Sequence, residues 1–188
     1  MDIKCSVFIA ASVDGFIARP DGDIDWLHRP EYEAAELNGV TFESFIATVD
    51  ALVMGRKTLE KVLSFPEWPY EGTPVIVLSH QQLEIPAHLE GKVEVMAGDL
   101  TTLVATLAER GMRHLYIDGG QTIQAFLDAG LIDELIITRI PVVLGKGIPL
   151  FSQEGSEREL HHLGTYASDN GFVQSRYRVG EAVAFCKG

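Results

Sequence analysis

Short apolar runs alternate along the chain with segments of helical spacing, and this alternation predicts an α/β fold. Residues 5–11 are almost continuously apolar, as in a strand buried on both faces of a parallel sheet. Similar runs occupy residues 51–54, 74–78, 93–96, 114–117 and 135–140, and helical patterns occupy 42–49, 100–111 and 123–127. We therefore predict a three-layer α/β/α arrangement with a mainly parallel central sheet.

The C-terminal part has a different pattern. Between residues 172 and 179, apolar and polar side chains alternate, which is typical of an antiparallel strand with one covered face. One face would carry Val173, Ser175, Tyr177 and Val179, and the other Gln174, Arg176 and Arg178. This pattern adds antiparallel C-terminal strands to the predicted sheet.

Size and charge limit the classes of function. A chain of 188 residues suits a single domain, which we expect to span residues 1–188. The net charge of −12 argues against nucleic acid and anionic membranes as partners. No apolar run approaches the ~20 residues of a membrane helix, and no signal peptide is recognised at the N-terminus. We expect a cytoplasmic protein.

Cysteine and histidine usage agrees with a reduced compartment and no metal site. Cys5 and Cys186 lie at opposite ends of the sequence and form no CxxC motif. His161 and His162 are adjacent, so on a strand they would point to opposite faces. We expect no bound metal.

Two predicted strands end in glycine at the start of a helix. The first junction is Gly55-Arg56-Lys57-Thr58, where backbone N–H groups and two cations could bind phosphate. The alternative is a strand turn with a solvated Arg-Lys pair. The second junction is Gly119-Gly120-Gln121-Thr122, which is either a pyrophosphate cradle or a tight turn. Because there are two such junctions, we favour a dinucleotide site.

Further candidates follow other strands. Ser79 and His80 come after a third buried strand, as a phosphate contact or as polar strand caps. Small residues near Ala11 leave room for a flat ring. Trp26 is either a core residue or a pocket wall. Glu31 follows a proline, so it is either a functional carboxylate or an acid that compensates a helix dipole.

Several motifs in fixed order resemble a known family. They are Ser12–Ala18 (SVDGFIA), Asp50–Thr58 (DALVMGRKT), Asp118–Gly120, Leu131–Leu135 (LIDEL), Gly145–Gly147 and Pro149–Phe151. Together they resemble the dihydrofolate-reductase-like superfamily. They are most similar to stand-alone relatives of the reductase (C-terminal) domain of the bifunctional riboflavin-biosynthesis deaminase/reductase, over residues 4–179.

The resemblance implies NADPH as hydride donor and gives each motif a role. Ala11 and Ile17 would hold the nicotinamide carboxamide through their backbones. The phosphates would be met by Gly55, Arg56, Lys57 and Thr58, the adenosine 2′-phosphate by Ser79 and His80, and the pyrophosphate by Gly119, Gly120, Gln121 and Thr122. Trp26 would lie on the substrate-side loop. Glu31 would assist protonation, with Thr138 hydrogen-bonded to its carboxylate.

We therefore expect an NADPH-dependent reductase that acts on a flat heterocycle or a ribosylaminopyrimidine, similar to 5-amino-6-(5-phosphoribosylamino)uracil reductase. Dihydrofolate or pterin reduction is one alternative, although Thr73 stands where folate enzymes carry an arginine. A non-catalytic NADP-binding domain is another. The resemblance also implies a homodimer, with Phe172, Tyr177 and Phe185 expected near its interface.

Overall fold

The computed structural model describes residues 2–33 and 35–182 and contains one large sheet. Its strands are β1 (Lys4–Ser12), β3 (Ala51–Gly55), β4 (Val75–Leu78), β5 (Val93–Met96), β6 (His114–Asp118), β7 (Glu134–Ile140), β9 (Arg158–Ala167) and β10 (Val173–Ala182). A separate two-stranded sheet joins β2 (Phe16–Ala18) to β8 (Ile148–Pro149).

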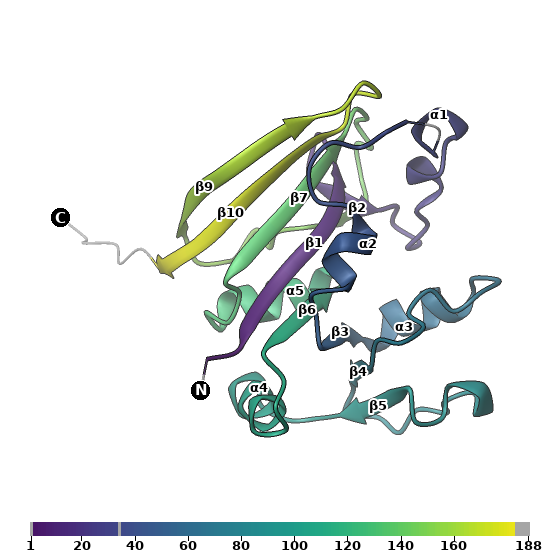
Figure 1. Cartoon of the computed structure of the whole chain (residues 1–188), viewed down its shortest axis with the longest axis vertical. Coiled ribbons are helices and arrows are strands. Elements are labelled where there is room, and N and C mark those ends of the chain that lie inside the picture. Colours follow the sequence, from purple (N-terminus) through teal and green to yellow (C-terminus); the bar gives the residue numbers. More distant parts are fainter. Residues whose placement is uncertain (1, 34, 183–188) are drawn as a thin grey trace.

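The strand order in the large sheet is β5-β4-β3-β6-β1-β7-β10-β9. All neighbours from β5 to β7 are parallel, whereas β10 is antiparallel to both β7 and β9. Figure 1 shows the last two strands at one side of the sheet. The predicted mainly parallel sheet with antiparallel C-terminal strands is confirmed. The sequence pattern located β10, but it did not give the position of β9.

Helices cover both faces of the sheet. They are α1 (Pro30–Glu33), α2 (Phe42–Ile46), α3 (Arg56–Leu63), α4 (Leu100–Glu109) and α5 (Gly120–Asp128), with short 3-10 helices η1 (Asp25–Leu27) and η2 (Ala87–Leu89). Val53 packs with the buried residues of α4 and α5, and its neighbours Leu52 and Met54 pack with those of α2 and α3. The alternation along one strand thus separates two hydrophobic cores.

Side-chain hydrogen bonds set where some of these helices begin. The Asp99 carboxylate accepts a bond from the Thr102 N–H (3.0 Å) at the start of α4. Thr41 and Ser44 form a capping box at the start of α2. The helix predicted over residues 42–49 ends at Ile46, because the chain then turns into β3 and the Thr48 hydroxyl donates to the Phe45 carbonyl (2.7 Å).

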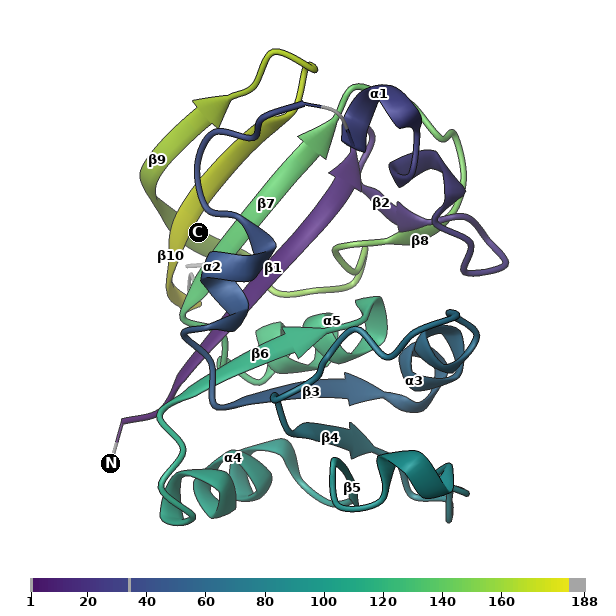
Figure 2. The ribbon, with the colours of Figure 1, turned by 45° about the vertical axis from the view of Figure 1, so that its right-hand side comes forward.

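The sheet opens between β1 and β6. These strands pair only from Lys4 to Ser6, whereas β1 pairs with β7 from Ser6 to Ser12. Figure 2 shows β1 and β6 close together near the N-terminus and diverging toward their carboxyl ends. The divergence leaves a gap between two parallel strands at the sheet edge where the predicted glycine junctions lie.

Within the described ranges, none of the helices combines the length and the apolar character required to cross a bilayer.

Candidate functional site

Two helix N-termini lie side by side at the carboxyl edge of the sheet. Strands β3 and β6 are adjacent, with Met54 opposite Asp118, and each continues directly into a helix. Gly55 precedes α3 and Gly119 precedes α5, and neither start has a side-chain cap or an acidic residue in its first turn. The first N–H groups of both helices are therefore available to one anionic ligand.

The two junctions approach each other closely. A Cβ atom added to Gly55 would lie 3.0 Å from Thr122 Oγ1, and one added to Gly119 would collide with the Thr58 hydroxyl. Gly119 also has a φ of +91°, which favours glycine. The structure thus brings together Gly55, Thr58, Gly119 and Thr122, each from a predicted phosphate motif.

A cation stands beside these helix starts. The Arg56 guanidinium donates to Gln81 Oε1 (2.7 Å), and its Nε lies 3.9 Å from a Glu60 carboxylate oxygen. The Ser79 hydroxyl donates to the Gln81 carbonyl (3.1 Å), so Arg56 and the segment after β4 form one group. Gln81 was missed by the sequence analysis, since a lone exposed glutamine carries no signal.

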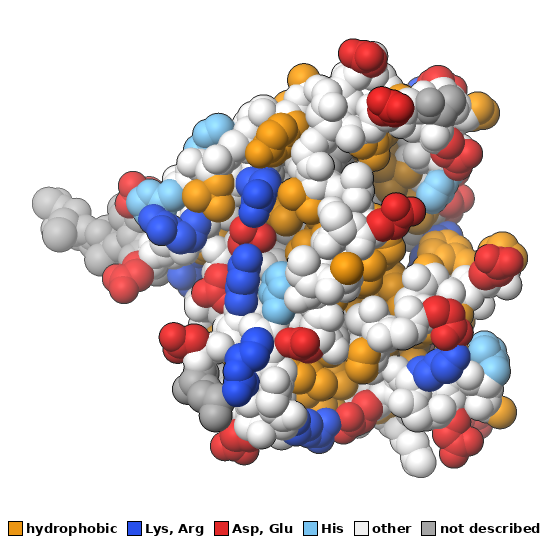
Figure 3. Space-filling view, in the orientation of Figure 1, with side chains coloured by type: hydrophobic (Ala, Val, Ile, Leu, Met, Phe, Trp, Pro, Cys, Tyr) orange, Lys and Arg blue, Asp and Glu red, His pale blue; other side chains and the backbone are white. Residues whose placement is uncertain are grey.

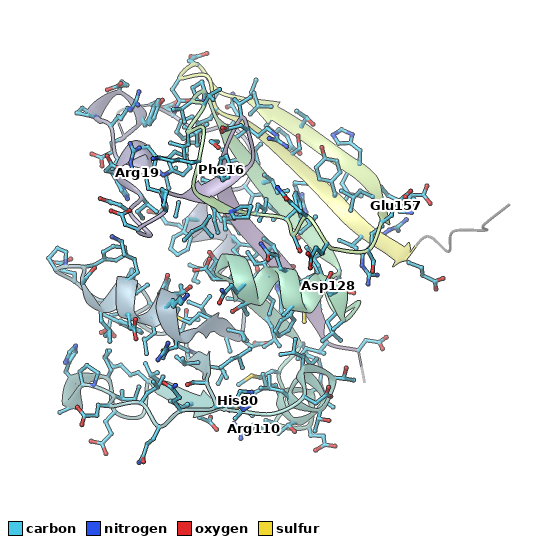
Figure 4. All side chains as sticks on the ribbon, turned by 180° about the vertical axis from the view of Figure 1, so that it is seen from behind. Phe16, Arg19, His80, Arg110, Asp128 and Glu157 are labelled. Atoms are coloured by element: carbon cyan, nitrogen blue, oxygen red, sulfur yellow. The ribbon has the colours of Figure 1, made fainter. Side chains whose placement is uncertain are left out.

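Other predicted phosphate contacts lie on the surface. Lys57, His80 and Gln121 are exposed, and His80 forms no hydrogen bond or ion pair with any described residue. In Figure 4, His80 is labelled in the lower half of the molecule, well below Phe16 of β2.

Asp118 ends β6 directly before the glycine pair. Its Oδ1 accepts a hydrogen bond from the Gly119 N–H (2.9 Å). Burial disfavours the charged carboxylate and raises the pKa of Asp118 to about 6, and the Gly119 hydrogen bond opposes this shift. A carboxyl group therefore titrates next to the two helix N-termini.

Backbone groups of β1 face the gap. The Lys4 N–H donates to the Arg113 carbonyl (2.8 Å) on the β6 side, and the Tyr116 hydroxyl donates to the Phe8 carbonyl (3.0 Å) from the same side. Cys5 and Val13 instead bond toward β7, through Asp133 and Val142. Because successive residues alternate, Ala10 directs its backbone groups into the gap and Ala11 directs its own toward β7.

The small sheet packs against the start of α5. Gly120 has so little space that an added Cβ would lie 3.2 Å from Ile17 and 3.0 Å from Ile148. The Asp14 carboxylate accepts bonds from the Leu144 N–H (3.1 Å) and the Gly145 N–H (2.8 Å), which tie the turn before β2 to the segment before β8. Hydrogen bonding, chiefly from the Ser12 hydroxyl, lowers the pKa of Asp14.

A cavity of about 160 Å³ lies over β1, β7 and β10, on the face of the sheet that carries α2. We call it the β1–β7 cavity. It is lined by Phe8, Ile9, Ala10, Leu27, Leu37, Asn38, Val40, Thr41, Phe42, Thr138, Ile140, Ser168, Phe172 and Gln174. Ala10 belongs both to this lining and to the edge of the gap, so the cavity and the gap adjoin.

The three predicted catalytic residues differ in their relation to this cavity. Thr138 lines it and accepts a long hydrogen bond from Gln174 Nε2 (3.4 Å). Trp26 is 1% exposed and packs with Tyr32 and Ile140 behind the lining, with no partner for its indole N–H among the described residues. Glu31 is exposed on α1 and makes no hydrogen bond with Thr138.

A second cavity of about 210 Å³ lies at the other end of α5. Its lining includes Leu127, Asp128, Phe151 and Arg158. Figure 4 shows Asp128 near the C-terminal end of α5, on the side of the molecule that also carries Glu157. This cavity is therefore separate from the glycine junctions, which lie at the N-terminal end of the same helix.

Comparison with known proteins agrees with this reductase-like architecture. The model of the RibD C-terminal domain family matches residues 4–174. The chain therefore belongs to the RibD C-terminal domain family, and its fold is that of the RibD reductase domains.

Two relatives match over most of their length. A Bacillus subtilis protein, "Uncharacterized protein YwjB", is 37% identical over 168 residues, which are 88% of this chain and 92% of the relative. A solved structure from Shewanella sp. PV-4, named "Putative riboflavin biosynthesis protein", is 42% identical with a TM-score of 0.85 and is covered over 100% of its length by 95% of this chain.

The structure of Acinetobacter baumannii RibD is more distant. It shares 19% identity and a TM-score of 0.73, and 95% of this chain spans 58% of that chain. This likeness shows the shared fold.

Proposed function

We propose that the protein is an NADPH-dependent reductase that transfers hydride to a polarised C=N or C=O carbon of a flat heterocycle. The observation that carries the proposal is the position of Ala10, which lines an apolar cavity and lies on β1 next to β6, the strand that ends at one of the two uncapped helix N-termini. A dinucleotide along the sheet edge would reach the cavity with its nicotinamide end.

The residues at the sheet edge fit such a cofactor. The starts of α3 and α5 suit the pyrophosphate, since neither helix has a capping side chain on its first N–H groups. Arg56, grouped with Ser79 and Gln81, suits the 2′-phosphate. We propose that the backbone of Ala10, and not that of Ala11, binds the nicotinamide carboxamide, because the backbone groups of Ala10 face the gap. Ile17 keeps its predicted role as the second residue that binds the carboxamide.

The reaction needs a hydride, an electron-pair acceptor and a proton. Bound NADPH would supply the hydride to carbon, the π electron pair of the C=N or C=O bond would pass to nitrogen or oxygen, and a proton would neutralise it. The protein would position the ring against β1 and exclude water through the apolar lining. We propose that Glu31 delivers this proton through a water molecule, because the residue is exposed.

The direct test measures cofactor binding and turnover separately. Titration by NADPH fluorescence should give an affinity for NADPH at least about ten-fold tighter than for NADH. NADPH oxidation is then followed at 340 nm with pterins, dihydrofolate and aminopyrimidines. Binding without oxidation of NADPH by any compound would favour a non-catalytic NADP-binding domain, and no binding would refute the proposal.

The proton-transfer role has its own matched pair. Glu31→Gln should keep the affinity for NADPH while it lowers turnover by roughly 10²–10⁴-fold. Glu33→Gln, on the same short helix and also exposed, should change neither. Equal turnover in both variants would mean that the proton comes from elsewhere.

We further propose that the protein acts in the cytoplasm as a homodimer whose interface includes β9. This strand is one of the two edges of the large sheet, and its Leu160, Leu163 and Tyr166 are 39%, 52% and 40% exposed. Of the residues predicted near the interface, Phe172 packs against Tyr32 (ring centroids 4.9 Å apart) and Tyr177 is half-buried. Phe185 lies outside the described residues.

A further inference from the structure

The cavity of about 210 Å³ lies on the face of the sheet opposite to the β1–β7 cavity. Its lining residue Leu135 packs with the core under α4 and α5, whereas the neighbouring Ile136 packs with the residues of α2 and α3. Figure 3 shows the α2 face, where hydrophobic side chains gather in the hollow between α1 and α2, and Figure 4 shows the molecule from behind, with Asp128 near the end of α5. We call this second space the α5–β9 cavity.

The α5–β9 cavity is distinct from the proposed reductase site. Among the described residues, the two cavities have no lining residue in common. Helix α5 has nine residues, so its ends lie about 13 Å apart at 1.5 Å per residue. The glycine junctions are at its N-terminal end and the α5–β9 cavity is at its C-terminal end. A ligand in this cavity would therefore contact neither the junctions nor the β1–β7 cavity.

Part of the lining is apolar. Leu127, Leu135, Phe151 and Leu160 contribute hydrophobic side chains. Leu135 is 1% exposed, whereas Phe151 is 42% exposed, so the apolar surface runs from the protein interior to solvent. An apolar cavity of roughly 150 Å³ is enough to bind benzene, and this one is larger. It has room for one ring and a few further atoms.

Two opposite charges belong to the same lining. Arg158 donates to the main-chain carbonyl of Asp128 (3.3 Å) and forms no ion pair with any described residue. The Asp128 carboxylate, for its part, accepts no hydrogen bond from the described part of the chain. Since a guanidinium has five N–H donors and a carboxylate about four acceptor sites, both groups can still bind a ligand.

The place of Asp128 in the helix is unfavourable for the helix itself. Asp128 is the last residue of α5, and the last turn contains no basic residue. The helix macrodipole opposes a negative charge at this end. Helix stability therefore does not account for an aspartate here, whereas a positively charged group of a ligand would be attracted both by the carboxylate and by the dipole.

The charges around the cavity select the kind of ligand. Glu154 lies between lining residues in the loop before β9, and Glu157 precedes Arg158. A ligand with only a carboxylate would meet Arg158 but would be repelled by Asp128 and these glutamates. A ligand with only an ammonium group would be repelled by Arg158. A ligand with both groups gives each charge of the lining a partner.

We infer that the α5–β9 cavity binds a small zwitterion of the amino-acid type with an apolar side chain. Its carboxylate would bind Arg158 and its ammonium group would bind Asp128. The side chain, of about the size of a phenyl ring, would lie among the leucines and Phe151. This inference does not depend on the proposed reductase function, because it uses none of the residues of that site.

Three ligands with the same ring test the need for both charges. They are phenylalanine, 3-phenylpropionate, which lacks the ammonium group, and 2-phenylethylamine, which lacks the carboxylate. In calorimetric titrations of the full chain, phenylalanine should bind at least about ten-fold more tightly than either of the others. Alanine, which has both charges and no ring, should bind at least about ten-fold more weakly than phenylalanine.

Two outcomes of these titrations would overturn the inference. One is the absence of phenylalanine binding at millimolar concentrations. The other is an affinity for phenylpropionate, phenylethylamine or alanine that equals or exceeds the affinity for phenylalanine.

Two variants place the ligand in the α5–β9 cavity. Arg158→Gln should lower the affinity for phenylalanine to about that for phenylethylamine, because the carboxylate has lost its partner. Asp128→Asn should lower it to about that for phenylpropionate. Arg158→Gln should not weaken the binding of phenylethylamine, and Asp128→Asn should not weaken that of phenylpropionate. Each retained ligand shows that the cavity of that variant is still folded.

The same chemical changes at remote exposed positions are the controls. Arg110→Gln changes an arginine that is paired with Glu94 at the end of α4, and Asp169→Asn changes an exposed aspartate after β9. Neither should alter the affinity for phenylalanine. Unchanged phenylalanine binding in Arg158→Gln and in Asp128→Asn, or an equal loss in the control variants, would refute the assignment to this cavity.

Discussion

Asp118 joins the fold to the candidate cofactor site at the level of one carboxyl group. It ends β6, holds the Gly119 N–H at 2.9 Å, and lies where the two helix N-termini meet. Its raised pKa of about 6 means that the folded chain keeps a proton that the unfolded chain has released above about pH 4.

This difference in proton binding predicts a specific pH dependence. Because the folded state binds more protons between pH 4 and 6, the contribution of Asp118 to the free energy of unfolding falls across that range and is lost above it. Asp118→Asn keeps an oxygen acceptor for Gly119 and removes the titration. On going from pH 4.5 to pH 7.5, we expect the free energy of unfolding of the variant to rise by about 1–3 kcal/mol relative to that of the wild type, as measured by urea unfolding.

The control for this measurement is Asp169→Asn, an exposed aspartate on the surface. The difference in the free energy of unfolding between this variant and the wild type should be the same at pH 4.5 and at pH 7.5. A difference for Asp118→Asn that does not change with pH would show that the carboxyl group is solvated in the folded chain.

Arg56 is the residue on which cofactor choice depends in our proposal. Arg56→Ala should remove most of the preference for NADPH over NADH, because a charge-assisted bond to phosphate contributes about 1.5–3 kcal/mol. The affinity for NADH should change little. Arg110→Ala is the matched control, since Arg110 is also paired with a glutamate, Glu94 at 2.8 Å, but lies at the end of α4. Loss of both affinities would instead assign Arg56 to the pyrophosphate.

Single residues also mark the limit of sequence reasoning. Ala11 was predicted to hold the nicotinamide, but whether Ala10 or Ala11 faces β6 depends on the register of β1 against β6 and β7. The proximity of Thr138 to Gln174 likewise follows from strand order, which no local pattern specifies. Glu31 was placed on a helix, as the structure has it, but its distance from Thr138 depends on how η1 and α1 pack.

At the scale of elements, the strand–glycine–helix units are what the sequence predicted best. Each combines a buried apolar run, a glycine and a helical pattern, so the signal is local. That Gly119 faces Thr58 while Gly55 faces Thr122 is a consequence of β3 and β6 being neighbours, which is a tertiary fact. The bounds of β9 were not predicted, because nearly all of its residues are exposed and give no regular alternation.

This reciprocal packing predicts the effect of a methyl group at the junction. Gly119→Ala should destabilise the fold by about 1–3 kcal/mol, because φ is +91° and the added Cβ meets Thr58. The double variant with Thr58→Ser removes a methyl group but not the hydroxyl, so it should recover little stability. Thermal unfolding and NADPH titration measure both effects.

A second glycine separates backbone strain from crowding. Gly130 also has a positive φ, +71°, but the nearest atoms to a Cβ added there belong to the end of the Arg158 side chain, at 3.6 Å. The Gly130→Ala variant should therefore lose stability through backbone strain alone and should bind NADPH normally. If Gly119→Ala binds NADPH as well as Gly130→Ala does, the glycine junction is only a turn.

At the scale of the whole molecule, the two parts of the sheet contribute to different parts of the proposed site. Strands β3, β4 and β6 direct their carboxyl ends toward the proposed cofactor site, and β7 and β10 form the floor of the β1–β7 cavity. β1 belongs to both parts and diverges from β6, as Figure 2 shows. The family model spans residues 4–174 and thus includes both halves of this arrangement.

The exposed edge strand β9 predicts that two copies of the chain form a dimer. β9 has no neighbour on its outer side among the described strands, and an exposed apolar edge strand is a ready partner for a second copy. Light scattering of the wild type should therefore give twice the mass of one chain across a range of concentrations.

Leu163→Glu should reduce this to the mass of one chain, since it places a charge on the most exposed leucine of β9 (52%). Val143→Glu, which charges a 69% exposed valine in the loop before β8, should remain dimeric. A wild type with the mass of one chain at every concentration would contradict the dimer, and a Leu163→Glu variant that stays dimeric would place the interface away from β9.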